Sequence, residues 1–352
     1  MAERMSVAVL GAGSWGTTLA ILLHENGHEV RLWEFDGDQA AALKTDRENK
    51  KFLPGVPVPK AIGIETDLAA ALEGAGLVLF VVPSHVVRAV AADAARSGVI
   101  ESNVIIVNAA KGLEEKTLKR MSEVLLDELP VERERVCTIS GPSHAEEVSK
   151  RMPTSVVVAG VDREIIQSVQ EVFFGSYFRV YTNSDLPGVE IGVALKNIIA
   201  IAAGVCDGLG YGDNTKAALL TRGLVEITRL GTALGARRET FFGLAGIGDM
   251  IATCLSRHSR NRHVGEKIGR GEPLDKVLGD MVMVAEGVRT TRAAVELGKK
   301  MGIDLPIITS VHEVLFSSMD PRQAINDLMN RPPQEEMSWI VSGDSERGRY
   351  EI

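Results

Sequence analysis

Two lysines occupy positions in the sequence from which a lysine could exchange a proton with a substrate or bind an anion. Lys196 and Asn197 interrupt a helix pattern over Val189–Cys206 that is otherwise apolar nearly all round. Burial of an ammonium group is costly and lowers its pKa, so such a lysine can act as a general acid or base. We interpret Lys196 in this way; a lysine snorkelling at a helix end is the alternative. Lys111 follows an apolar strand pattern, where open α/β sheets bind ligands, although a surface lysine would look the same.

A second group of polar residues surrounds a predicted helix start. A glycine-rich approach, residues 243–248, leads to Asp249, and Thr253 lies four residues further on the same helix face. Asp249 could also be a helix cap. The stretch Ser256–His263 then holds three arginines and two histidines, and guanidinium forks are the groups that bind a small phosphate well.

Two other uses of this basic stretch are disfavoured. The chain has 39 Lys and Arg against 47 Asp and Glu, a net charge of −8, and no aromatic residue interleaves with these arginines. We therefore expect no nucleic-acid partner. His258 and His263 are five residues apart, a poor helical spacing for one metal ion, and the chain has no HExxH motif, so we expect no metal site.

Composition points to a soluble intracellular protein. The three cysteines are far apart in the sequence, which fits neither a disulfide framework nor a zinc cluster and suits a reducing, cytoplasmic setting. The longest apolar run, residues 198–206, is far shorter than the ~20 residues that span a bilayer. We expect no integral membrane segment.

A glycine-rich turn near the N-terminus is typical of a dinucleotide site. An apolar strand pattern at Val7–Leu10 runs into Gly11, Gly13 and Gly16, which open a helix pattern. In such a turn the first glycine allows the tight bend, the second lets a pyrophosphate approach, and the third allows helix and strand to pack closely. The helix start adds free N–H groups and the positive end of the helix dipole. A glycine turn without a ligand is the alternative.

The end of the second strand pattern carries the residue that would select the cofactor. Glu34 lies 23 residues after Gly11, near the ~20 expected for the acid that binds the adenosine ribose. A carboxylate accepts a hydrogen bond from the 2′-hydroxyl of NAD and repels the 2′-phosphate of NADP, so we favour NAD. Arg31 and Arg47 could still reach this pocket, and Asp36 could be the ribose contact instead.

The elements that position these residues form two domains. Apolar runs alternate with helix patterns over the first ~180 residues, which predicts a Rossmann-like, doubly wound, mostly parallel sheet in an α/β fold. The strand signals stop after Leu186, and an all-helical domain follows. We place the domains at 1–186 and 187–335, with a charged tail at 336–352. The predicted strands are Val7–Leu10, Glu29–Trp33, Leu77–Val82, Val104–Asn108, Val136–Ile139, Ser155–Ala159 and Phe178–Tyr181.

Six short motifs occur in an order and spacing that resemble the NAD(P)-dependent sn-glycerol-3-phosphate dehydrogenases, in their soluble bacterial form. The resemblance covers residues 5–330 and implies interconversion of glycerol 3-phosphate and dihydroxyacetone phosphate, which supplies phospholipid synthesis. The motifs are GAGSWG at 11–16, AKG at 110–112, SGPS at 140–143, LKN at 195–197, GIGD at 246–249 and SRN at 259–261.

The resemblance also assigns roles to residues. It makes Lys196 the proton acceptor or donor at C2 of the substrate, with Asn197 and Thr253 at polar positions beside it. Arg260 and Lys111 would touch both substrate and cofactor. The further substrate contacts implied are Gly141, Ser143, Asp249, Ser259 and Asn261. The cofactor contacts implied besides the glycines are Ser14, Trp15, Phe35, Ala145, Val284 and Glu286.

One position departs from the pattern of the family. Many of its NADPH-using bacterial members carry His or Arg around the turn where Glu34 and Phe35 stand. The expected cofactor is therefore NAD or NADP, with NAD favoured from Glu34. The expected partner is a small phosphorylated substrate, and the resemblance allows for a homodimer.

Two other functions use the same frame. The 6-phosphogluconate and β-hydroxyacid dehydrogenases share a Rossmann-plus-helical layout and a lysine base, but they match Ser14-Trp15 and the SRN motif less well. A dinucleotide sensor without turnover would need no buried pair of Lys196 and Asp249.

Overall fold

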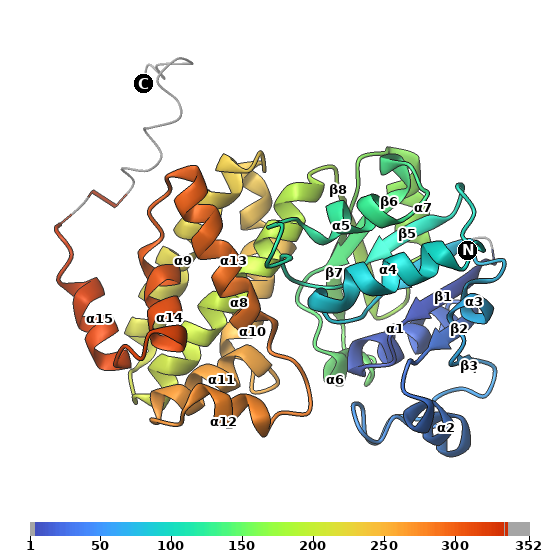
Figure 1. Cartoon of the computed structure of the whole chain (residues 1–352), viewed down its shortest axis with the longest axis horizontal. Coiled ribbons are helices and arrows are strands. Elements are labelled where there is room, and N and C mark those ends of the chain that lie inside the picture. The colour runs from blue at the N-terminus through green and yellow to red at the C-terminus, as the bar shows by residue number, and fades with distance from the viewer. Residues whose placement is uncertain (1–3, 334, 337–352) are drawn as a thin grey trace, which may run out of the picture.

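The computed structural model describes residues 4–333, 335 and 336, and it shows a sheet domain followed by a helical domain (Figure 1). The predicted tail at 336–352 lies outside the described residues except for Glu336. The sheet has eight strands: β1 Ser6–Leu10, β2 Glu29–Trp33, β3 Gly63–Glu65, β4 Leu77–Phe80, β5 Ile105–Asn108, β6 Val136–Ser140, β7 Thr154–Ala159 and β8 Phe178–Asn183.

The order of the strands across the sheet is β3-β2-β1-β4-β5-β6-β7-β8, and every neighbouring pair is parallel except β6 with β7. The prediction of a mostly parallel, Rossmann-like sheet is confirmed. The sequence analysis missed β3, because three residues at a sheet edge form no apolar run that the pattern could reveal.

Helices cover both faces of the sheet. Along β1 the side chains alternate: Val7 and Val9 belong to one apolar cluster, and Ala8 and Leu10 to another on the opposite face. A strand buried on both faces therefore has the continuous apolar run that predicted it. The helices of this domain are α1 Ser14–Glu25, α2 Gly37–Asp46, α3 Leu68–Leu72, α4 Val87–Arg96, α5 Met121–Glu128, α6 Ala145–Val148 and α7 Arg163–Phe173, with short 3₁₀ turns at Ser84–Val86 and Arg133–Arg135.

The helical domain is built around one long helix, α8 Leu186–Gly208, which Asp185 caps by accepting a hydrogen bond from the Gly188 N–H at 3.1 Å. Around it lie α9 Asp213–Ala233, a 3₁₀ turn Arg238–Phe242, a π turn Leu244–Gly248, α10 Asp249–Leu255, α11 Arg260–Gly269, α12 Leu274–Gly279, α13 Glu286–Met301, α14 Pro306–Phe316 and α15 Pro321–Met329. By length and composition α8 could cross a membrane, but 94% of its most apolar stretch is buried inside the protein, as in the core helix of a folded domain.

Helix α11 packs closely on α8 because each helix carries a glycine where the backbone of the other approaches. A Cβ on Gly204 would lie 1.9 Å from the Arg262 carbonyl oxygen, and one on Gly265 would lie 1.9 Å from the carbonyl oxygen of Ile201. No other residue type fits either position without movement of a helix backbone. This contact brings the start of α11, which carries the SRN motif, close to the part of α8 that carries Lys196.

Candidate active site

The glycine turn between β1 and α1 has the geometry that a pyrophosphate requires. Gly11 has φ +110°, and a Cβ on Gly16 would lie 1.8 Å from the Gly11 carbonyl oxygen. A Cβ on Gly13 would meet no atom within 4 Å, so this side of the turn is open for a phosphate to approach the backbone. No side chain caps α1, whose first N–H groups remain available. The residues present therefore fit a dinucleotide.

The acid after β2 lies beside this turn. Glu34 is only 5% exposed, and its carboxylate accepts a hydrogen bond from the Asp36 N–H at 3.0 Å. Burial raises the pKa of Glu34. Asp36 itself caps α2, and Arg31 and Arg47 each donate to backbone carbonyl oxygens at 2.9 Å. Of the side chains considered for the ribose, Glu34 bonds within its own turn beside the glycines, whereas Asp36 caps a helix and the two arginines hold loops. Phe35 beside it is 79% exposed.

Three charged side chains meet where the two domains join. One Asp249 oxygen accepts from Lys196 Nζ and the other from Lys111 Nζ, both at 2.8 Å. Lys196 also donates to the Thr253 hydroxyl, and Lys111 donates to the Gly141 carbonyl oxygen at 3.1 Å. Two ammonium groups share one carboxylate, so the cluster carries a net charge of +1 and suits an anionic substrate.

Burial and charge set the protonation of this cluster. Desolvation, together with the nearby charge of Lys111, outweighs the attraction of Asp249 and lowers the pKa of Lys196 to about 8. Burial alone would raise the pKa of Asp249, but Lys111 and Lys196 together hold it below its usual value. A lysine with a pKa near neutrality can exchange a proton with a substrate at physiological pH.

The interpretation of Asp249 as a helix cap is wrong. It is the first residue of α10, Gly248 occupies the cap position, and no side chain caps the helix. The Asp249 side chain is 2% exposed and accepts from the two lysines and from Thr253, four residues on. The i, i+4 spacing therefore serves the cluster rather than the end of the helix.

The start of α11 brings three further predicted residues to this region. Ser259 caps α11 by accepting from the Arg262 N–H at 3.2 Å, and Asn261 accepts from the Gly287 N–H at 2.9 Å, so both also have structural roles. The Arg260 side chain is exposed, and the described residues show no hydrogen bond from its guanidinium group. Arg262, by contrast, pairs with Asp207 at 2.6 Å. Arg260 is therefore the arginine of this helix start that is available to a ligand.

The strands β5 and β6 end in the loops that complete the site. Gly141 has φ +144°, and the Ser143 hydroxyl donates to its carbonyl oxygen at 3.0 Å. Asn197 is buried on α8 directly after Lys196, and Ala145 is buried at the start of α6. His144, just before α6, has its pKa lowered by burial, and its ring lies 6.0 Å from that of His258. These positions bring the substrate residues predicted from the sequence to one region of the domain junction.

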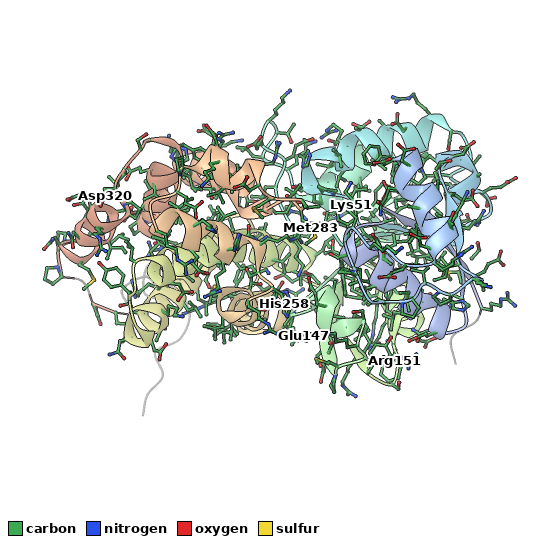
Figure 2. All side chains as sticks on the ribbon, turned by 90° about the horizontal axis from the view of Figure 1, so that it is seen from below. Lys51, Glu147, Arg151, His258, Met283 and Asp320 are labelled. Carbon is green, nitrogen blue, oxygen red and sulfur yellow. The ribbon has the colours of Figure 1, made fainter. Side chains whose placement is uncertain are left out.

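The segment before α13 joins the domains on the cofactor side. The Ser84 N–H and hydroxyl both donate to the Glu286 carboxylate, the former at 2.9 Å. The Ser14 hydroxyl lies 3.8 Å from the Met283 sulfur, and Val284 follows in the same segment. Trp15 instead packs against the core of the sheet domain, with its ring 6.4 Å from that of Phe178. Figure 2 labels Met283 and His258 where the helical domain faces the sheet domain.

Sequence reasoning missed three polar residues around the site: Ser84, Asn108 and Glu190. Ser84 stands between Pro83 and His85, and no motif marks it. Asn108 ends an apolar strand, and Glu190 is a charge in the same apolar helix pattern that made Lys196 noticeable. The rule that singled out Lys196 could have found Glu190 as well.

Two family models match most of the chain. The model described as the N-terminus of NAD-dependent glycerol-3-phosphate dehydrogenase matches residues 6–166, and the model of its C-terminus matches residues 185–326. Proteins named glycerol-3-phosphate dehydrogenase (NAD(P)+) are similar over nearly their whole length. The one from Geobacillus thermodenitrificans is 52% identical over 96% of this chain and 98% of its own, and the one from Chlorobium phaeobacteroides strain BS1 is 51% identical over 95% and 100%.

Solved structures of other proteins are similar to this chain in fold. A crystal structure of glycerol-3-phosphate dehydrogenase from Coxiella burnetii is similar with a TM-score of 0.89 and 38% identity, over 93% of this chain and 99% of that one. A ketopantoate reductase from Ralstonia eutropha is similar with a TM-score of 0.60 and 16% identity, over 91% and 100%, and shares the fold alone.

Proposed function

The chain belongs to the NAD-dependent glycerol-3-phosphate dehydrogenase family, and on that premise we propose that Lys196 is the proton acceptor and donor of the reaction. The enzyme interconverts sn-glycerol 3-phosphate and dihydroxyacetone phosphate with NAD or NADP. The observation that carries the proposal is the buried Lys196, held at 2.8 Å by Asp249, with a pKa of about 8.

The proton chemistry follows from this geometry. When bound, the nicotinamide supplies a hydride to C2 of the ketone or takes it from C2 of the alcohol. In reduction, negative charge grows on the C2 oxygen, and the Lys196 ammonium group stabilises it and donates a proton. In oxidation, neutral Lys196 accepts the hydroxyl proton. Asp249 and Thr253 hold the Lys196 nitrogen in place through both directions.

The net positive cluster and the exposed Arg260 support a substrate phosphate bound between the domains. Lys111 and Arg260 supply the charge in this proposal, and the ordered loop at Gly141 and Ser143 supplies close backbone approach. Ser259, Asn261, Asn197 and Thr253 line the same region. A guanidinium fork binds two phosphate oxygens at once, which an ammonium group does not.

The cofactor side supports a preference for NAD. Glu34 is the acid beside the glycine turn, and Arg31 and Arg47 are engaged elsewhere, so nothing among these side chains would neutralise a 2′-phosphate. In the proposal Gly11, Gly13 and Gly16 cradle the pyrophosphate, with Ser14, Trp15, Phe35, Ala145, Lys111, Arg260, Val284 and Glu286 as further contacts.

We also propose that residues 1–186 form the cofactor domain and that residues 187–335 form the substrate domain. We propose that the enzyme works in the cytoplasm, supplies glycerol 3-phosphate for phospholipid synthesis and assembles as a homodimer. A sensor without turnover would have no use for a buried acid/base pair, which disfavours that alternative.

One experiment tests the function and the cofactor together. Dihydroxyacetone phosphate reduction is measured with NADH and with NADPH in parallel, on the wild-type enzyme and on a Glu34→Arg variant. We expect turnover with both cofactors, a higher kcat/KM with NADH, and a shift toward NADPH in the variant. A wild-type preference for NADPH would overturn the interpretation of Glu34, and turnover with neither cofactor would overturn the proposed activity.

A further inference from the structure

A second buried carboxylate, Glu190, lies on α8 between the catalytic lysine and the sheet. Its side chain is 3% exposed and accepts hydrogen bonds through both oxygens. One oxygen accepts from the Ser122 N–H at 2.9 Å and from the Thr138 hydroxyl at 3.0 Å. The other accepts from Arg120 Nη1 at 2.8 Å and from the Ser122 hydroxyl at 2.5 Å. Every donor comes from the sheet domain, so Glu190 ties α8 to that domain.

Two donors to Glu190, Thr138 and Asn108, precede the loops that carry Gly141 and Lys111. Thr138 lies on β6, whose loop carries Gly141, the backbone partner of Lys111. Asn108 ends β5 and donates to Glu190 at 3.4 Å. The Asn108 side chain also binds the backbone of Ala110. It accepts a hydrogen bond from the Ala110 N–H at 3.0 Å and donates one to the Ala110 carbonyl oxygen at 3.1 Å. The residue after Ala110 is Lys111.

We propose that Glu190 is a positioning residue, which sets the loops of Lys111 and Gly141 against the Lys196–Asp249 pair. Lys196 comes from the same helix as Glu190, whereas Lys111 comes from the sheet domain, and both lysines must reach one carboxylate at 2.8 Å. A displacement of about 1 Å between the two elements would break one of these bonds. Glu190 touches no reacting atom in this scheme and acts through Asn108 and Thr138.

The amide variant removes this connection while it keeps the shape of the side chain. In Glu190→Gln one carboxylate oxygen becomes an NH₂ group, and whichever position it takes, it faces a donor: Arg120 on one side or the Ser122 N–H on the other. A buried donor then lacks an acceptor, and Arg120 loses the charge of Glu190 while it keeps its ion pair with Glu123 at 3.1 Å. The strand ends and their loops are expected to move away from α8.

The pH profile reports this movement. The charged and titratable groups that face Lys196 are Asp249 and Cys254 from α10, Lys111 from the loop after β5, and His144 before α6. Lys111 lowers the pKa of Lys196 through charge repulsion. When Lys111 moves away, the pKa of Lys196 rises, and the limb of the pH profile that it governs moves to higher pH.

The test compares Glu190→Gln with a matched control. Glu226 is an equally buried carboxylate, 3% exposed, and accepts hydrogen bonds from the Ile307 and Ile308 N–H groups at the start of α14. Neither of these bonds involves the lysine cluster. For Glu190→Gln we expect the KM for dihydroxyacetone phosphate to be about tenfold higher. The limb of the pH–rate profile that Lys196 governs is expected to move to higher pH by about half a unit, and the Kd for NADH is expected to stay unchanged. For Glu226→Gln we expect the wild-type KM and pH limb.

A merely structural role would lower the thermal midpoint and the amount of active enzyme, but neither changes the KM of the folded fraction. If Glu190→Gln does not fold, Thr138→Val removes one of the Glu190 hydrogen bonds with little change of shape, and we expect a KM about threefold higher. A wild-type KM and pH limb in the folded variant would overturn the inference. The inference rests on the proposed function, which fails separately if the wild-type enzyme shows no turnover.

Discussion

The cofactor side and the substrate side of this site are built in opposite ways. The proposed pyrophosphate site is a run of six residues, 11–16, whose backbone and missing Cβ atoms do the work. The substrate side consists of charged side chains from a strand loop, α8, α10 and α11. The first depends on glycine geometry within one turn, and the second depends on several elements being placed together with their charges balanced.

The two sides therefore differ in what damages them. In the glycine turn a side chain at Gly11 or Gly16 would come too close to the neighbouring backbone. The turn has no charged side chain of its own, so such a substitution does not disturb a charge balance. The lysine cluster holds a buried and a partly buried cation on one carboxylate. Removal of either lysine leaves a neutral pair, whereas removal of Asp249 leaves two ammonium groups without their counter-ion in a region of low dielectric. Four predictions test this contrast, in order of decreasing effect.

The largest effect is expected on the substrate side, from Lys196→Ala. Loss of the general acid/base is expected to lower kcat about 10²–10⁴-fold, because this is the usual contribution of such a group. The Kd for NADH, measured by fluorescence titration, is expected to stay at the wild-type value. Near-normal turnover would show that Lys196 is not the proton donor.

The cofactor side is tested by a pair of glycine variants. Gly13→Ala adds a methyl group that meets no atom within 4 Å, so the fold is expected to persist, while the Kd for NADH rises roughly tenfold, or ~1.4 kcal/mol. Gly16→Ala places the same group 1.8 Å from the Gly11 carbonyl oxygen and is expected to lower the thermal midpoint as well. Equal cofactor affinity in wild type and Gly13→Ala would contradict the close approach of a phosphate at this residue.

The pH dependence tests the charge balance of the cluster. With a Lys196 pKa of about 8, kcat/KM for glycerol 3-phosphate oxidation is expected to rise up to tenfold per pH unit below pH 8, because the base must be neutral. Reduction needs the protonated form, so its kcat/KM falls above that pH. In Asp249→Asn the attraction that raises this pKa is lost, and the limb is expected to move to lower pH. A limb that stays in place would argue that another group governs it.

The smallest effect is expected from Arg260→Lys. The charge remains but the planar fork is lost, so the KM for dihydroxyacetone phosphate is expected to rise about fivefold, or ~1 kcal/mol, with kcat nearly unchanged. Arg257→Lys, at a neighbouring exposed arginine, serves as the control and is expected to leave the KM unchanged. Equal KM values in the two variants would remove Arg260 from the phosphate site.

Much of the fold could be predicted because its patterns are local. Seven of the eight strands follow from short, mostly apolar runs, and the short edge strand β3 does not. Helix boundaries follow less directly from composition. Residues 117–129 have helical composition, but α5 begins at Met121, because Leu113 and Arg120 first pair as an isolated bridge that closes the preceding loop. A contact across seven residues overrides propensity there.

The residues of the site likewise differ in whether local sequence or long-range packing determines them. The glycine turn at 11–16 and Lys196 in its apolar helix can be recognised from the sequence alone. Tight backbone geometry and the cost of a buried charge each restrict which residues can stand at one position. The sequence does not reveal that Lys111 and Lys196, 138 and 53 residues away from Asp249, share its carboxylate. Nor does it reveal that Glu190 binds Ser122 on α5 and Thr138 on β6. Side-chain partners far apart in sequence are chosen by how helices and strands pack, and packing depends on the whole chain.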